Sequence, residues 1–197
     1  MKILLGSSSP RRLEILSMFF QDITVIKPHI DESILPGESP TGHVTRLALQ
    51  KSMSIGSLHQ YTREEALLIT SDTTVTIHNE ILGKPTGHDD AIRMLTRLSG
   101  KTHRVITGIT LAFTHMGNVR RITGSEATAV TFKPLDNSEI GKYLSLIHYR
   151  DKAGSYAIQD HGDMIIREIE GSYSNVIGFP LRLFWKMTLE AGILEWI

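Results

Sequence analysis

The sequence predicts an α/β protein with a mixed, twisted sheet and flanking helices. Short apolar runs are followed by segments in which apolar residues recur at helical spacing, as in Val44, Leu47 and Ala48. Residues 67–82 have a different pattern, in which two strand-like runs are joined by the turn His78-Asn79-Glu80. Because helical crossovers connect parallel strands and tight turns connect antiparallel ones, a chain with both predicts a mixed sheet.

The composition narrows the classes of function. The chain has 197 residues, enough for one large domain or two small ones with a buried core. Its 21 Lys and Arg residues equal its 21 Asp and Glu residues, so the net charge gives no reason to expect nucleic-acid or membrane binding. The absence of Cys excludes disulfides and thiolate metal sites, and the nine His residues form no His-Glu-x-x-His sequence.

No stretch predicts a secretory or membrane segment. The apolar core of the N-terminal sequence MKILLGSSSPRR is too short for a signal peptide, and its two Arg residues follow that core. No run approaches the roughly 20 apolar residues of a membrane span. We therefore expect a soluble, cytoplasmic globular protein.

The first two predicted elements flank a candidate anion site. Residues 3–5 predict a buried strand, and Ser9 and Pro10 suit the N-cap and first position of a helix. The serines at 7–9, the N–H groups of the first helical turn, Arg11 and Arg12 could together bind a phosphate. The alternative is a capped helix with solvated arginines, but the strand–loop–helix order favours phosphate binding. The apolar side of this helix comprises Leu13, Leu16, Phe19 and Phe20.

The next elements supply two carboxylates and a lysine. Residues 23–26 predict a second strand, and Asp31 and Glu32 follow in a loop bounded by Pro and Gly. A helix is expected from Ser39-Pro40. Its apolar stripe consists of Val44, Leu47, Ala48, Ile55 and Leu58. Lys51 falls on the same stripe, so its ammonium either extends along the helix to water or points into a site.

The stretch from Leu67 to Pro85 is the centre of the predicted site. Its apolar run ends in residues 70–73, which predicts Asp72 at the carboxyl end of a buried strand, where open α/β sheets bind their ligands. The hairpin that follows returns Lys84 toward Asp72, so that a carboxylate and a cation would share one pocket. Taken by itself, the stretch also fits an Asp in a turn and a Lys on a surface loop.

The remaining elements complete the α/β pattern. A helix is expected from Asp89 with a C-cap at Gly100, and another is expected to be capped by Asn137 or Ser138. The other expected elements are a strand over 102–114, a turn at 116–118, a paired strand within 127–132, a polar loop over 149–162, a strand over 164–169, a loop over 172–180 and a helix over 181–191.

Six stretches, considered as a set, resemble the signatures of the Maf proteins. They are Ser7 to Arg12 (SSSPRR), Ser71 to Val75 (SDTTV), Gly83 to Pro85 (GKP), Leu98 to Gly108 (LSGKTHRVITG), Asp151 to Gln159 (DKAGSYAIQ) and Asn175 to Pro180 (NVIGFP). They occur in order, and the resemblance extends from Ile3 to about Gly192. Thr74 and Phe179 stand where the family usually has an apolar residue and a Leu, and neither departure removes a chemical group.

The resemblance implies an inosine triphosphatase-like (Maf) fold, with residues 1–197 as a single domain and the active site in a central cleft. Such proteins are nucleoside triphosphate pyrophosphatases, which cut between the α- and β-phosphates and release a monophosphate and pyrophosphate. The resemblance further implies a divalent metal cation, Mg²⁺ or Mn²⁺, as cofactor, and often a homodimer. Neither stable nucleic-acid binding nor membrane association is expected.

The resemblance also assigns roles to individual residues. Asp72 matches the proton acceptor, and Glu32 is a candidate second carboxylate for the metal. Arg11, Thr73 and Gln159 stand where members acting on dTTP and UTP have Arg, Thr and Gln, so these two nucleotides are the expected substrates. The other expected substrate-binding residues are Ser7, Lys51 and Lys84.

These assignments agree with the chemistry of the reaction. Attack of water on the α-phosphorus needs a base, and Asp72 could accept the proton or bind a metal ion that acidifies the water. Lys51, Lys84 and Arg11 would offset the charge on the departing pyrophosphate. The amide of Gln159 and the hydroxyl of Thr73 suit the edge of a pyrimidine base.

Other functions stay open at this point. The protein could be a non-catalytic, nucleotide-binding regulator of cell division, which would bind a nucleotide without releasing pyrophosphate. It could also act on a modified nucleotide, such as 5-methyl-UTP, pseudo-UTP or 7-methyl-GTP, and so keep modified nucleotides out of nucleic acid. A basic nucleic-acid module is disfavoured by the zero net charge.

Overall fold

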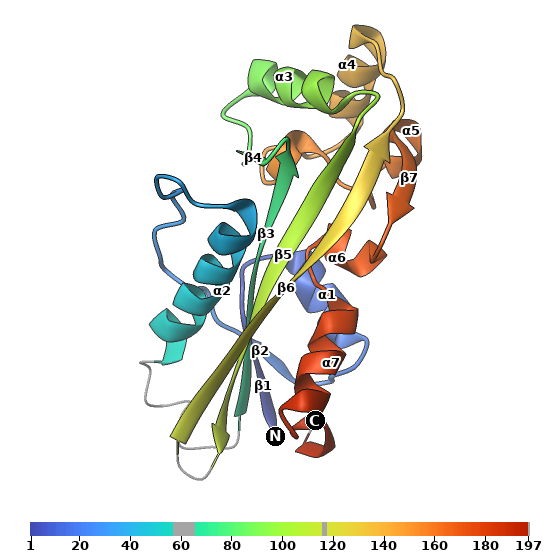
Figure 1. The fold of residues 1–197 in the computed structure, drawn as a ribbon. Helices are drawn as coiled ribbons and strands as arrows, with labels where there is room; N and C mark the ends of the chain where they lie inside the picture. Colours follow the sequence, from blue (N-terminus) through green and yellow to red (C-terminus); the bar gives the residue numbers. More distant parts are fainter. Residues whose placement is uncertain (57–65, 116–117, 197) are drawn as a thin grey trace. The chain divides into compact units, whose positions relative to one another are not determined.

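The structure is a computed structural model that describes residues 1–56, 66–115 and 118–196 (Figure 1). The chain divides into two compact units, each made of segments that are separated in the sequence. Unit 1 comprises Met1–Asp72, Thr107–Glu126 and Gly178–Ile197, and unit 2 comprises Thr73–Ile106 and Ala127–Ile177.

The strands form a mixed sheet, as the sequence predicts. They are β1 (Lys2–Gly6), β2 (Ile23–Val25), β3 (Ala66–Ile77), β4 (Glu80–Leu82), β5 (Thr102–His115), β6 (Asn118–Phe132) and β7 (Ile166–Glu170). Within the described residues the strand order is β2-β1-β3-β5-β6-β7, and β4 pairs with β3. β1 is parallel to β2 and β3, whereas β4 is antiparallel to β3 and β7 is antiparallel to β6. The expected α/β class is therefore confirmed.

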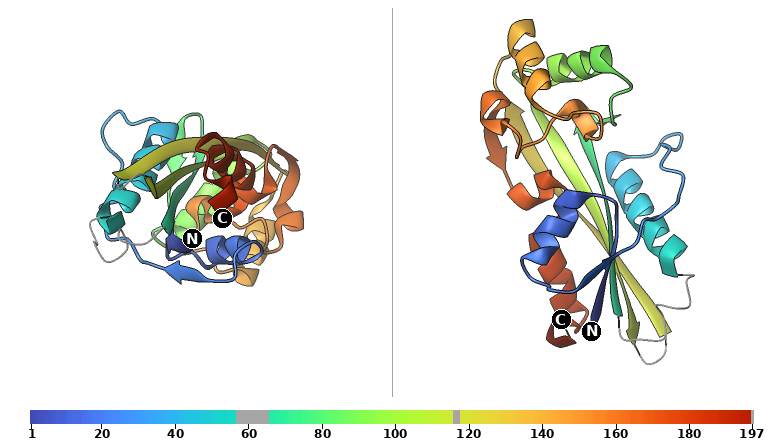
Figure 2. Two further views of the ribbon diagram at one scale, coloured as in Figure 1. Left: turned by 90° about the horizontal axis from the view of Figure 1, so that it is seen from below. Right: turned by 180° about the vertical axis from the view of Figure 1, so that it is seen from behind.

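The helices of unit 1 cover both faces of its strands. They are α1 (Pro10–Ser17), α2 (Pro40–Gly56), α7 (Leu181–Glu190) and the 3-10 helix η2 (Leu194–Trp196). α2 lies on one face, and α1 and α7 lie side by side on the other, as Figures 1 and 2 show. The ring centroids of Phe20, just after α1, and Phe184 of α7 are 6.3 Å apart. The predicted stripe of α2 is buried at Val44, Leu47, Ala48 and Ile55, while Leu58 lies outside the described residues.

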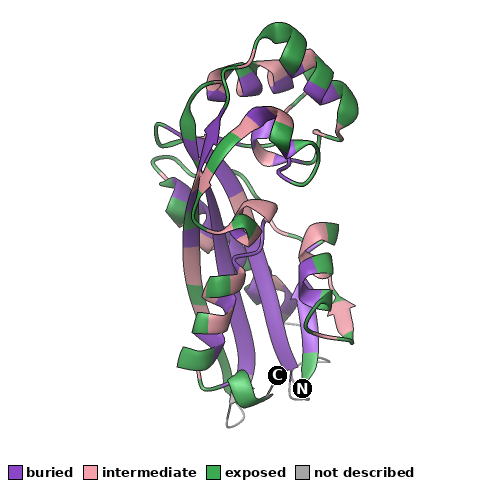
Figure 3. Ribbon diagram, turned by 90° about the vertical axis from the view of Figure 1, so that its right-hand side faces the viewer, coloured by how far each residue is buried: buried purple, intermediate pink, exposed green. Residues whose placement is uncertain are grey.

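Unit 2 has its own apolar core. Its helices are α3 (His88–Leu98), α4 (Asn137–Leu146), η1 (Ala153–Ser155), α5 (Gly162–Ile165) and α6 (Tyr173–Ile177). Leu95 of α3, Tyr143 of α4 and Phe132 of β6 belong to one buried cluster. Figure 3 shows buried residues along the strands and exposed residues on the outer sides of the helices. Across the described ranges, no helix has the length and apolar character needed to cross a membrane.

β3 corrects one detail of the predicted site. Residues 70–73 do not end the strand, because β3 continues to Ile77 and pairs with β4, with Val75 opposite Leu82. The neighbouring strand β1 does end there, since its last residue, Gly6, pairs with Thr70. Asp72 therefore lies just past the end of the parallel β1–β3 pairing, in the middle of a long strand rather than at its carboxyl end.

α4 begins one residue earlier than predicted. Its N-cap is Asp136, which accepts the N–H of Glu139 at 2.8 Å, and the Glu139 carboxylate accepts the N–H of Asp136 at 2.8 Å. This reciprocal capping box satisfies two helix donors, so Asn137 and Ser138 lie inside the first turn instead of capping it.

Three strand and loop boundaries also differ from the prediction. β6 begins at Asn118, well before residue 127, and its first residues are exposed, so the apolar alternation that marks a strand is missing there. β7 begins at Ile166 because residues 162–165 form α5, and the expected loop over 172–180 contains α6. The predicted turn at 116–118 falls on residues 116–117, which lie outside the described ranges.

Candidate active site

Arg12 connects the loop between β1 and α1 to other segments of unit 1. Its Nη1 donates to Ser7 Oγ at 3.0 Å and to the Ser71 carbonyl at 2.9 Å, and its Nε donates to the Gly178 carbonyl at 2.9 Å. Ser7 is buried, and its hydroxyl also accepts the N–H of Ser9 at 3.1 Å. Arg12 thus joins the loop to β3 and to the segment before α7. The expectation that both arginines bind an anion stays a prediction.

The start of α1 nevertheless concentrates positive charge. Burial lowers the pKa of Arg12, the carboxylate of Asp72 raises it, neighbouring Arg11 lowers it, and Glu32 raises it. Arg11 is half-buried in the first turn, behind Pro10 at the first position of the helix. The N–H groups of that turn have no acceptor within the helix itself. This helix end therefore combines a cation, Arg11, with backbone N–H groups that the helix itself does not satisfy.

Lys51 points into the site instead of extending to water. Its Nζ lies 2.7 Å from Asp72 Oδ1 and 2.7 Å from Glu32 Oε1. The side chains of Lys51 and Asp72 are only 7% and 13% exposed, whereas Glu32 is 47% exposed. Because one nitrogen contacts both carboxylates, the two contacting oxygens, Asp72 Oδ1 and Glu32 Oε1, are separated by no more than twice 2.7 Å. A buried ammonium requires such partners, since an uncompensated charge in the interior is strongly unfavourable.

Close packing of α2 on the sheet brings Lys51 to Asp72. Thr70 Oγ1, on β3, donates to the Ala48 carbonyl of α2 at 2.7 Å. Gly108 of β5 faces the same helix so closely that a Cβ there would lie 2.4 Å from the Val44 carbonyl oxygen. These two contacts leave no layer of side chains between α2 and the strands at this point.

Unit 2 holds the loop that carries Lys84. Gly154 donates its N–H to the Gly83 carbonyl at 3.0 Å, and it has a positive φ of 68°. A Cβ on Gly154 would meet the Val75 side chain at 3.0 Å, so Gly is needed here both for conformation and for space. The loop after Gly83 and the loop around η1 are therefore fixed to one another, and Lys84 is exposed beside them.

Gln159 follows a backbone segment that α4 anchors. The Tyr143 hydroxyl of α4 donates to the Ala157 carbonyl and accepts the Ala157 N–H, both at 3.1 Å. Gln159 itself is exposed, and Thr73 is half-buried on β3. The structure thus brings Ser7, Glu32, Lys51 and Asp72 into unit 1 along with Arg11. Thr73, Lys84 and Gln159 belong to unit 2, and their convergence on the same substrate stays a prediction.

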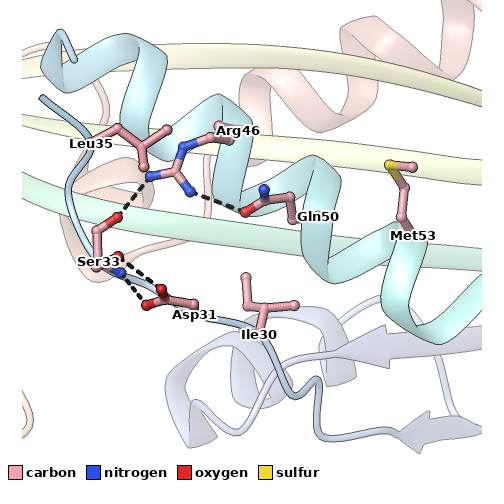
Figure 4. A pocket seen from close by; sticks show the side chains of 7 residues that line it. All are labelled: Ile30, Asp31, Ser33, Leu35, Arg46, Gln50 and Met53. Atoms are coloured by element: carbon pink, nitrogen blue, oxygen red, sulfur yellow. Dashed lines mark hydrogen bonds between the residues drawn. The ribbon is translucent and has the colours of Figure 1, made fainter. Parts of the chain in front are cut away.

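A hollow of about 420 Å³ lies beside the loop that carries Glu32 (Figure 4). Its lining residues are Ile30, Asp31, Ser33, Leu35, Arg46, Gln50 and Met53. None of these described lining residues is among the predicted site residues. The lysine and its two carboxylates therefore lie next to this hollow and not in it.

The carboxylates suit a hard divalent cation that also binds a substrate. Asp72 and Glu32 offer two carboxylate groups, and Mg²⁺ usually takes one or two of them together with substrate phosphates. In the described part of the chain, no group of three or more His, Cys, Asp and Glu side chains could hold a metal ion. The donor set therefore fits a metal–nucleotide complex better than a permanently bound ion.

Sequence reasoning missed the network around Arg46 and Glu38. Arg46 Nε donates to Glu38 Oε1 at 2.6 Å, Arg46 Nη2 donates to Glu38 Oε2 at 2.8 Å, and His43 Nδ1 lies 2.9 Å from Glu38 Oε2. Glu38 precedes α2 and Arg46 lies in its middle, a spacing that matches no local helix or strand pattern. The only signal in the sequence is a carboxylate near a helix start.

The fold and the site define an α/β protein in which a buried lysine joins two carboxylates next to a cationic helix start. The chain belongs to the family described as Maf-like protein, which matches residues 2–191. The resemblance read from the six motifs is thereby confirmed.

Its relatives agree closely in length and name. A protein named dTTP/UTP pyrophosphatase from Thermosipho africanus is 40% identical over 99% of this chain and 96% of its own length. Proteins of the same name from Pseudoalteromonas atlantica and Clostridioides difficile are 45% and 43% identical, over 91% and 92% of this chain and 91% and 90% of their own lengths.

Among solved structures, a nucleoside-triphosphatase, dITP/XTP pyrophosphatase, from Mycobacterium abscessus matches with a TM-score of 0.41 and 16% identity. The match covers 68% of this chain and 76% of that protein. A similarity of this size supports no conclusion about the site, so the family assignment rests on the sequence matches.

Proposed function

We propose that the protein is a nucleoside triphosphate pyrophosphatase that hydrolyses dTTP and UTP to the monophosphate and pyrophosphate. The observation that carries the proposal is the buried Lys51 ammonium in contact with Asp72 and Glu32, at 2.7 Å each. A base, a second carboxylate and a cation are the groups that attack on a phosphorus requires. The names of the relatives support the choice of substrates. In this proposal residues 1–197 act as one catalytic domain.

Asp72 is the proposed base. The water proton passes to the Asp72 carboxylate as the water oxygen bonds to the α-phosphorus, and the bond from that phosphorus to the oxygen bridging to the β-phosphate breaks. The contact with Lys51 holds the carboxylate in place on β3. Pyrophosphate leaves with its negative charge stabilised by Lys51, Arg11 and Lys84.

A divalent cation, Mg²⁺ or Mn²⁺, is part of the proposal. Asp72 and Glu32 would hold it, and it would supply positive charge against the phosphate oxygens of the nucleotide. The Lys51 ammonium, which contacts both carboxylates, keeps the pair together before a nucleotide arrives.

Selectivity for dTTP and UTP is assigned to Arg11, Thr73 and Gln159. Sites built to hydrogen-bond a substrate reject analogues that lack the partner, because buried polar groups are then left unpaired. CTP is the sharpest comparison, since it differs from UTP only at the hydrogen-bonding edge of the base.

The test is pyrophosphate release from a panel of triphosphates with Mg²⁺ or Mn²⁺. The panel contains UTP, dTTP, CTP, GTP and ATP, together with 5-methyl-UTP, pseudo-UTP and 7-methyl-GTP. The proposal predicts the highest kcat/KM for the uracil- and thymine-type bases. Equal rates for UTP, CTP and GTP would refute the selectivity. Tight binding without pyrophosphate release would favour the nucleotide-binding regulator instead.

A further inference from the structure

We propose that Arg46 is a positioning residue, which holds Glu32 at the candidate site by fixing the loop of residues 26–39, here called the β2–α2 loop. The inference rests on the proposed function, because the position of Glu32 affects turnover only if the Lys51 site is catalytic. It extends that function by naming a residue that does not itself contact Lys51 or Asp72 through any hydrogen bond in the described residues.

The β2–α2 loop has little packing to hold it in place. Residues 31–37 are all exposed, and the loop contains no helix or strand between Val25 and Pro40. Within it, the Asp31 carboxylate accepts the N–H of Ser33 at 2.9 Å and its hydroxyl at 3.0 Å, which makes a local turn. An exposed loop of this kind owes its conformation to polar contacts more than to apolar burial.

Arg46 supplies the contacts that attach this loop to α2. Its guanidinium donates to both carboxylate oxygens of Glu38, at 2.6 and 2.8 Å, and Nη2 also donates to the Ser33 carbonyl at 2.9 Å. Glu38 in turn accepts the N–H of Leu35 at 3.2 Å. Figure 4 shows Arg46 reaching from α2 to Ser33 on the loop. The planar guanidinium has several donors in a fixed fork, so it can bind these acceptors at the same time. A lysine ammonium is less suited to this geometry.

The ion pair stays charged at neutral pH. Hydrogen bonds from Arg46 lower the pKa of Glu38 to about 2. The side chain of Glu38 is only 9% exposed, so this two-pronged contact is protected from water more than a surface ion pair. The attachment is therefore expected to persist across the whole pH range of an assay.

The residue that Arg46 contacts and the residue that Lys51 contacts are neighbours in the chain. Ser33, which Arg46 holds by its carbonyl, directly follows Glu32, which Lys51 holds by its carboxylate. Two side chains of α2 thus contact two consecutive residues of the loop. Without Arg46, the residue that follows Glu32 would no longer be attached to α2, and the cost of ordering the loop would oppose the contact between Glu32 and Lys51.

The first experiment compares Arg46→Ala in the wild-type and Glu32→Gln backgrounds, with kcat/KM for UTP at several Mg²⁺ concentrations. Loss of a residue that orients a metal-binding carboxylate typically costs roughly 10- to 100-fold, and we expect a fall of that size together with a higher Mg²⁺ requirement. In the Glu32→Gln background the same change should add less than about threefold, because interacting residues are not additive. An equal fall in both backgrounds would overturn the inference. If Arg46→Ala does not fold, Arg46→Lys, which keeps the charge but not the fork, replaces it.

The second experiment measures the loop without using activity. Hydrogen exchange of the amides of residues 31–38 should be faster in Arg46→Ala than in the wild type. Arg97→Ala is the matched control, because Arg97 makes a two-pronged pair with Glu80 in unit 2, and it should leave exchange in the loop and turnover unchanged. Unchanged loop exchange in Arg46→Ala, or faster exchange with wild-type turnover, would overturn the inference. A wild-type protein that releases no pyrophosphate would instead refute the proposed function, and faster exchange would still support the loop attachment.

Discussion

Asp72 is the residue on which the proposed chemistry depends most directly. Asp72→Asn is nearly isosteric but removes the base and one of the two charges that contact Lys51. General-base catalysis is typically worth roughly 10²- to 10⁴-fold, so pyrophosphate release should fall by a factor in that range while the circular dichroism spectrum stays unchanged. Asp89→Asn, at an exposed position in the first turn of α3, is the control and should keep the full rate. A folded Asp72→Asn protein with wild-type turnover would exclude Asp72 as the base.

His103 gives the stability of the protein a pH dependence of its own. The residue is 2% exposed, its Nε2 lies 2.8 Å from the Tyr156 hydroxyl, and its Nδ1 has no hydrogen-bond partner among the described residues. Burial lowers the pKa of His103 from 6.5 to about 4. The unfolded chain therefore binds a proton between these values that the folded protein excludes. His103 therefore leaves the free energy of unfolding unchanged above pH 6.5. As the pH falls from 6.5 toward 4, His103 lowers that free energy by roughly 3 kcal/mol in total.

Urea denaturation of the wild type and His103→Phe at a series of pH values measures this effect. Phe preserves an aromatic ring next to Phe132 and Tyr156, whose ring centroids lie 4.8 and 5.4 Å from that of His103. The wild type should lose more stability than the variant between pH 6.5 and 4. Parallel pH profiles for the two proteins would contradict the assignment to His103.

At the scale of the elements, the position of α2 depends on a glycine in the neighbouring strand. A Cβ added in Gly108→Ala would lie 2.4 Å from the Val44 carbonyl oxygen, which is backbone and cannot rotate away. Overpacking of this kind typically costs about 1–3 kcal/mol, and because α2 carries Lys51, turnover should fall as well.

Gly141→Ala in α4 is the matched control for this substitution. A Cβ there meets no atom within 4 Å, and alanine in a helix is typically more stable than glycine by roughly 0.5–1 kcal/mol. Chemical denaturation should therefore give opposite signs for the two Gly→Ala changes. A Gly108→Ala protein as stable as the wild type would contradict the close approach of α2 to β5.

The elements with a strong apolar period could be predicted from the sequence. The stripe of α2 and the hairpin from β3 to β4 were both predicted, and the positive φ of His78 and Asn79 is what a tight hairpin turn requires. The full length of β3 could not be predicted, because a run of polar residues such as 70–74 normally marks the end of a strand. Here pairing with neighbouring strands on both sides of Asp72 keeps the strand continuous.

The candidate site was predicted in part for similar reasons. Lys51 was a candidate because a charge on an apolar stripe requires an explanation, and Asp72 because a carboxylate followed a buried run. Two features of the site could not be predicted: the contacts of Arg12 with β3 and with the segment before α7, and the attachment of the β2–α2 loop by Arg46. Both depend on carbonyl groups and loop paths that are far from these arginines in the sequence, such as Gly178 for Arg12.

At the scale of the whole molecule, the residues proposed to select the substrate belong to both units. Arg11 belongs to unit 1, and Thr73 and Gln159 belong to unit 2. Gln159→Glu replaces an amide donor by a carboxylate while keeping the size of the side chain. We expect kcat/KM for UTP to fall by roughly 10- to 100-fold, the equivalent of one or two lost hydrogen bonds, with little change in the Mg²⁺ requirement. Equal losses for UTP, CTP and GTP would show that Gln159 does not read the base.

The central claim is hydrolysis by attack of water on the α-phosphorus, and phosphorus NMR of a dTTP digest in ¹⁸O-enriched water tests it most directly. The products should be dTMP and pyrophosphate in equal amounts, with the ¹⁸O shift confined to the dTMP signal. Release of dTDP and orthophosphate, or ¹⁸O in the pyrophosphate, would place the attack on another phosphorus and contradict the claim.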